Sequence, residues 1–183
     1  MKASLAIVVL LFFGTSYRGQ GAIEDPGGAS PWERAAMNRD SAARALSNQA
    51  LIILAGADEL RQVNDGDTRL RRQRFSQVGG MELTAGGLFL RAHGNFIKAA
   101  TNWSKARDEL RKTDAGLSHV PAVRASRDDS HISAQHACVL AAQSFERAAG
   151  AYAVGHAGDL VKAGLANEKA AECREIIAAN QAS

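Results

Sequence analysis

Alanine and large apolar residues alternate along one stripe of residues 82–112, and this pattern constrains the fold more than any other feature of the sequence. Each type recurs every seven positions, and in order the stripe is Ala85, Phe89, Ala92, Phe96, Ala99, Trp103, Ala106 and Leu110. Spacings of three and four residues place these side chains on one face of an α-helix. Because alanine lets helix axes approach to roughly 8 Å, the pattern predicts a helix that packs closely against others.

Three further segments carry the same kind of stripe, so we predict helices over residues 31–63, 82–112, 130–156 and 159–180. The other stripes are Ala43, Leu46, Ala50, Ile53, Ala57 and Leu60; Ala134, Cys138, Ala141, Phe145, Ala148, Tyr152 and Gly155; and Leu160, Ala163, Ala166, Ala170, Cys173 and Ile177. Runs of β-branched or aromatic residues are scarce, which argues against strands. We therefore predict an all-α fold. Its expected form is an antiparallel four-helix bundle with alanine-rich, coiled-coil-like heptad seams and up-down-up-down topology.

The beginning of the first helix has a clear local signal. Ser30 is suited to the N-cap, Pro31 to the first helical position, and Glu33 follows the cap by three residues. This is the sequence of a capping box, with proline where its missing N–H costs nothing. Asp159 is the expected N-cap of the last helix.

The N-terminal segment has the composition of a secretory signal peptide. Lys2 precedes an apolar run from Leu5 to Phe13, and small residues follow it. The run is roughly half as long as a membrane-spanning helix, and we expect no transmembrane segment after signal removal. The alternative is an uncleaved membrane anchor or a buried helix. The predicted location is the periplasm or the extracellular space. The expected divisions are a signal peptide over 1–21, a flexible lead-in over 22–30 and a single helical domain over 31–183.

Removing the signal peptide also removes Lys2 and Arg18, so the formal net charge falls from +3 to about +1. A nearly neutral chain argues against a nucleic-acid partner. One basic cluster stands out, in the expected connection between the first two helices: Arg69, Arg71, Arg72 and Arg74. One interpretation is weak contact with an acidic partner, a phospholipid surface or a polyanion, and another is proteolytic processing after Arg72. The alternative is a solvated loop or a helix extension that faces water.

The chain has two cysteines, Cys138 and Cys173, and an even number in an exported protein permits a disulfide. The midpoint between them falls close to the turn expected between the last two helices. In neighbouring antiparallel helices they would therefore lie at nearly the same height, within about 3 Å. We predict a disulfide between them, the alternative being two buried free thiols.

No motif for catalysis or cofactor binding is recognisable. The nucleophile patterns Gly-x-Ser-x-Gly and Ser-x-x-Lys and the zinc pattern His-Glu-x-x-His are absent, so we expect no enzyme activity and no cofactor. The paired Glu-x-x-His motifs of metal-binding bundles are also missing. Gly79-Gly80 and Gly86-Gly87 lack the Lys-Ser or Lys-Thr of a phosphate-binding loop, and we expect them to break or fray a helix start. Asn102-Trp103-Ser104 matches an N-glycosylation sequon, with an unmodified helix residue as the alternative.

The segment from Gly158 to Ala170 resembles the second helix of a tetratricopeptide repeat, because Gly158, Ala163 and Ala170 match the small-residue positions of that family. Asn167 stands where the family has an aromatic residue. Arg147 stands where the preceding helix has a tryptophan, and the pattern does not recur after 34 residues. The resemblance implies an alternative architecture of stacked helical hairpins.

Two functions are consistent with the sequence. Every regular feature is explained by helix packing, which favours a non-enzymatic interaction or structural module whose partner is another protein. The alternative is a binder of a small molecule or metal within the bundle, for which His93, His136 and Asn95 are the candidate polar residues.

Overall fold

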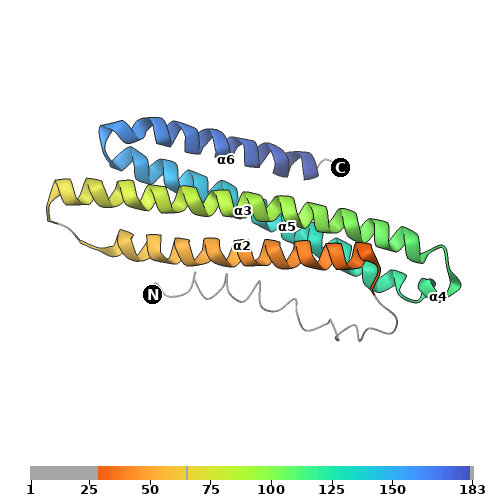
Figure 1. Cartoon of the computed structure of the whole chain (residues 1–183). Helices are drawn as coiled ribbons and strands as arrows, with labels where there is room; N and C mark the ends of the chain where they lie inside the picture. The colour runs from red at the N-terminus through yellow and green to blue at the C-terminus, as the bar shows by residue number, and fades with distance from the viewer. Residues whose placement is uncertain (1–28, 65, 182–183) are drawn as a thin grey trace, which may run out of the picture.

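Four long helices account for most of the chain. The computed structural model describes residues 29–64 and 66–181, and that part contains helices and turns but no strand. The elements are α2 (Pro31–Gln62), α3 (Thr68–Leu110), the short α4 (Asp114–Leu117), α5 (Val120–Val154), the 3₁₀ turn η2 (Ala157–Asp159) and α6 (Leu160–Gln181). Successive long helices run in opposite directions (Figure 1). The prediction of an all-α, antiparallel bundle is confirmed.

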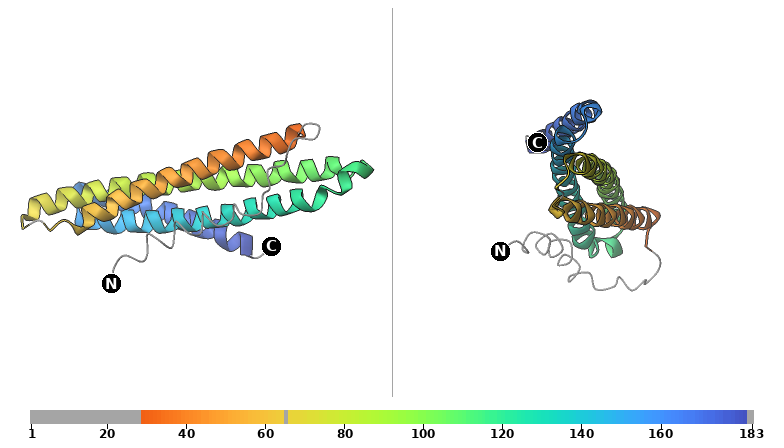
Figure 2. Two further views of the ribbon diagram at one scale, coloured as in Figure 1. Left: turned by 90° about the horizontal axis from the view of Figure 1, so that it is seen from below. Right: turned by 90° about the vertical axis from the view of Figure 1, so that its left-hand side faces the viewer.

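The bundle has a three-helix body with a fourth helix on one side. α3 packs against both α2 and α5, and α6 packs mainly against α5. The end-on view in Figure 2 shows α6 on the far side of α5 from α2. Each long helix of the body is about as long as a whole tetratricopeptide repeat of about 34 residues, which contains two helices. The resemblance to that family therefore does not extend to the architecture.

The predicted seams form the core. The alanines of the α3 stripe are fully buried, and so are Phe89 and Phe96. The α6 stripe is buried from Ala163 to Cys173, but Leu160 at its start is exposed. Including Leu160 in that seam was wrong, because its side chain, next to the α5–α6 turn, is 62% exposed.

The ends of the helices agree only partly with the prediction. The capping box of α2 is present: Ser30 Oγ accepts from the N–H of Glu33 at 3.2 Å, and Glu33 Oε2 accepts from the N–H of Ser30 at 2.7 Å. Asp159 directly precedes α6, and its Oδ2 accepts from the N–H of His156 at 3.1 Å. The predicted starts of the two middle helices were too late, because α3 begins at Thr68 and α5 at Val120.

The glycine pairs in α3 do not break the helix, contrary to the prediction. A Cβ atom at Gly79 would lie 2.9 Å from Cδ1 of Tyr152, and one at Gly86 would lie 2.6 Å from Cε1 of Phe145. Both rings belong to α5, so these glycines provide the space in which the aromatic side chains pack. Tertiary packing compensates for the low helix propensity of glycine here.

The predicted signal peptide and most of the predicted lead-in lie outside the described residues. Among the helices that are described, none combines the length and the hydropathy that crossing a membrane would require.

Candidate functional site

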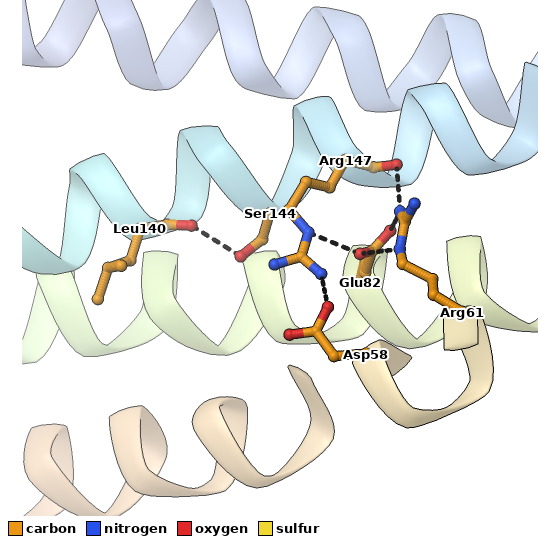
Figure 3. A network of polar contacts seen from close by, with 6 residues as sticks. All are labelled: Asp58, Arg61, Glu82, Leu140, Ser144 and Arg147. Carbon is orange, nitrogen blue, oxygen red and sulfur yellow. Dashed lines mark hydrogen bonds and ion pairs between the residues drawn. The ribbon is translucent and has the colours of Figure 1, made fainter. Parts of the chain in front are cut away.

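The most extensive polar cluster surrounds the carboxylate of Glu82, on α3 (Figure 3). Arg61 of α2 donates to Glu82 from Nη2 at 2.7 Å and from Nε at 3.2 Å, and Nε of Arg147, on α5, donates to it at 2.8 Å. Arg147 also pairs with Asp58, while Arg61 donates to the carbonyl oxygen of Arg147 at 3.3 Å. The cluster thus joins three helices with two carboxylates and two guanidinium groups, and its formal charges cancel.

Burial differs within this cluster. The Glu82 side chain is fully buried, whereas the side chains of Arg61 and Arg147 are 31% and 38% exposed. A buried carboxylate is tolerated only when charged donors surround it, and these two arginines supply the donors while their outer edges still contact water. The sequence interpretation missed Glu82. Its signal was present, because Phe75, Glu82 and Phe89 are spaced by seven, which places the carboxylate on the large-residue seam.

A second polar contact joins the same three helices nearer the other end of the bundle. Asp40 of α2 accepts from Nε1 of Trp103 at 3.2 Å, and its Oδ1 accepts from the hydroxyl of Ser130 at 3.0 Å. Burial raises the pKa of Asp40, although both hydrogen bonds favour the ionised form. The predicted seam of α2 began at Ala43 and therefore missed this residue as well.

The two cysteines face each other across α5 and α6, as their matched heights predicted. Both are buried free thiols, and Sγ of Cys138 donates to the carbonyl oxygen of Cys173 at 3.5 Å. Burial raises the pKa of Cys138, and it raises the pKa of Cys173 to about 12. Protonated, buried thiols are poor nucleophiles. The predicted disulfide is not formed in this structure, and the bond stays a prediction.

The basic cluster lies in the first two turns of α3, so its expected position in a connecting segment was wrong. Asp67 caps the helix, since its Oδ1 accepts from the N–H of Arg69 at 2.7 Å. The guanidinium groups of Arg71 and Arg74 lie 5.9 and 5.8 Å from the ring centre of Phe75. The capping carboxylate and the aromatic ring stabilise these helical turns, which agree with the alternative of a helix extension rather than with a connecting loop.

The polar residues suggested for a ligand site do not face one another. Nδ1 of His93 lies 2.9 Å from the carbonyl oxygen of Ala134 on α5, whereas Asn95 accepts from Nη1 of Arg39, on α2, at 3.2 Å. His136 is exposed on α5. Within residues 29–64 and 66–181, no group of three or more His, Cys, Asp or Glu side chains is arranged to hold a metal ion.

Comparisons with protein-family models, with curated proteins and with solved structures give no match to this chain.

Proposed function

We propose that this chain is an exported, non-enzymatic helical bundle that acts as an interaction or structural module, with another protein as its partner. The observation that carries the proposal is the use of two carboxylates between the helices, the buried Glu82 and the half-buried Asp40. Glu82 and Asp40 each accept hydrogen bonds from two other helices, so they are occupied in holding α2, α3 and α5 together. A catalytic or ligand site needs polar groups that converge on an open space. These groups converge on one another instead.

Export is tested by following the tagged full chain through cell fractionation. A charge placed in the apolar leader run by Leu10→Arg should keep the chain inside the cell at its unprocessed mass, because the run must be apolar to act as a signal. The conservative change Leu10→Ile is the matched control and should leave export intact. Retention of the unaltered chain inside the cell, with its leader still attached, would contradict this part of the proposal.

The interaction role is tested by placing a photo-crosslinking residue at exposed positions on three helices: Ile52 of α2, Ile132 of α5 and Val161 of α6. A module with a defined partner should give one discrete crosslinked species from one face and little from the others. Native mass spectrometry of the isolated chain is the companion measurement. A small molecule retained by the chain, without any crosslinked protein, would replace the proposal with the ligand-binding alternative.

A further inference from the structure

The turn between α5 and α6 packs against α3, which is distant in the sequence, near one end of the bundle. The α5–α6 turn contacts α3 at Ser76, whose side chain hydrogen bonds to Asp159. The first eight residues of α3, 68–75, therefore project about 12 Å beyond this turn. Figure 1 shows the start of α3 and the α5–α6 turn at the same end, opposite α4. We call residues 66–76 together with 154–162 the basic end.

Arginine is concentrated on the α3 side of the basic end. Arg69, Arg72 and Ser76 follow one another at spacings of three and four, so they lie on one face of α3, and Ser76 on that face touches the α5–α6 turn. The guanidinium groups of Arg69 and Arg72 form no ion pair with any other described residue. The adjoining residues 59–67 contain three acidic residues, Glu59, Asp65 and Asp67. The carboxylate of Asp67 caps the start of α3.

The opposite end of the bundle has a different charge pattern. Residues 105–129 contain six basic and five acidic side chains, and the two signs are interleaved. Arg107 pairs with Asp108 and Arg127 pairs with Asp128 in this segment. The basic end, by comparison, holds five basic and two acidic side chains, a formal net charge of +3 against +1 for residues 105–129. An excess of positive charge therefore distinguishes the basic end from the opposite end.

Exposed aliphatic side chains accompany these arginines. Leu70 is 52% exposed between Arg69 and Arg71, and the α5–α6 turn adds Leu160 at 62% and Val161 at 82%. Val63 and Val154 are also exposed at this end. Isolated exposed apolar residues need no explanation, but several at one end beside a basic cluster form an amphipathic surface.

We propose that the basic end binds a membrane surface rich in anionic phospholipids. Arg69 and Arg72 would contact lipid phosphates, while Leu160 and Val161 enter the boundary between headgroups and acyl chains. Sequence-tolerant nucleic-acid binding uses exposed aromatic rings for base stacking, whereas the exposed apolar side chains here are aliphatic. This inference goes beyond the proposed function and does not depend on a protein partner.

The test is co-sedimentation of the whole chain with vesicles of phosphatidylcholine alone and of equal parts phosphatidylcholine and phosphatidylglycerol. Binding should favour the anionic vesicles and weaken with added salt. The double variant Arg69→Gln plus Arg72→Gln should lower the partition coefficient by about 25-fold, at roughly fivefold per arginine. The matched control Arg111→Gln plus Arg124→Gln removes the same charge at the opposite end and should leave binding nearly unchanged.

Insertion is read out separately with Val161→Trp. After subtraction of the emission of the unaltered chain, which contains Trp32 and Trp103, the fluorescence of the new tryptophan should shift to the blue on anionic vesicles, because the ring enters a less polar environment. Ile132→Trp, at an exposed α5 position away from the basic end, should show no shift.

Three results would overturn the inference: equal binding to neutral vesicles, an equal loss in the two charge variants, or no shift at position 161. Binding to duplex DNA or to an acidic protein in place of vesicles would also overturn it and identify that class of partner instead.

Discussion

Replacing Gly86 by alanine should destabilise the bundle, although the same change one residue later should stabilise it. A Cβ at position 86 would lie 2.6 and 2.7 Å from two ring carbons of Phe145, whereas a Cβ at Gly87 would have no neighbour within 4 Å. Favourable carbon contacts lie at about 3.5–4.0 Å, so the ring would have to move by roughly 1 Å. Phe145 is 1% exposed and packs in the core cluster that contains Phe89, which leaves little room for that movement.

The magnitude follows from two opposing effects. Alanine gains about 1 kcal/mol over glycine inside a helix, and overpacking a core costs about 1–3 kcal/mol. Gly87→Ala should therefore raise the free energy of unfolding by up to about 1 kcal/mol. The free energy of unfolding of the Gly86→Ala variant should be lower than that of the Gly87→Ala variant by about 1–3 kcal/mol. Urea unfolding with a shared m-value measures both changes.

A second substitution identifies the cause. Phe145→Leu removes the ring that the new methyl group meets, so Gly86→Ala should cost less in that background than in the unaltered chain. Their coupling energy in a double-mutant cycle should be at least about 0.5 kcal/mol. Equal stabilisation by Gly86→Ala and Gly87→Ala, or strict additivity with Phe145→Leu, would refute the packing argument.

Three further predictions concern the polar groups. Glu82→Gln should lower the free energy of unfolding, measured in urea, by about 2 kcal/mol, because it weakens hydrogen bonds from two arginines. The control Glu146→Gln should lower it by less than about 1 kcal/mol, because the ion pair between Glu146 and Arg174 is exposed. Hydrogen bonds from Lys162 and Ser76 hold the pKa of Asp159 at about 2, so the ionised carboxylate stabilises the fold at pH values above the ordinary carboxyl pKa. Asp159→Asn should therefore lower the melting temperature at pH 7, and this difference from the unaltered chain should shrink as the pH falls toward 2. The chain isolated from an oxidising compartment should contain the Cys138–Cys173 disulfide, and a non-reducing mass with both thiols free would disprove it.

Much of the fold could be predicted because the seams are periodic over many turns. Alanines and aromatic residues at seven-residue spacing identify the buried face of α3 whatever its neighbours are. The start of α3 could not be predicted in the same way, because Gly79 and Gly86 weaken the local helical signal. They are helical because Tyr152 and Phe145, more than 50 residues away in the sequence, occupy the space that their missing side chains leave. Only the tertiary contact reveals that compensation.

The candidate surface was only half visible in the sequence. The four arginines of the basic end fall within six residues, so the sequence alone identifies them as a cluster. Leu160 and Val161 lie some 90 residues later, and the sequence assigned them to the start of an ordinary helix. The contact between Ser76 and Asp159 brings the two segments to one end. Glu82 and Asp40 were missed for a different reason, because the seams were followed through apolar residues and stopped at the first acidic one.

The Glu82 carboxylate resolves an ambiguity in helix register that the heptad seams create. A stripe that repeats every seven residues would pack almost equally well if α3 slid by one heptad, about 10.5 Å, along α5. Such a slip would remove Glu82 from Arg147 and place Phe75 or Phe89 there instead, which leaves buried charge without a partner. We therefore infer that the Glu82 cluster selects the register.

Combining Glu82→Leu with Arg61→Met and Arg147→Met should keep the bundle folded, because apolar replacement of a buried ion pair often leaves the free energy of unfolding nearly unchanged. It should also give more than one set of amide resonances, and a single set identical in pattern to that of the unaltered chain would show that packing alone fixes the register.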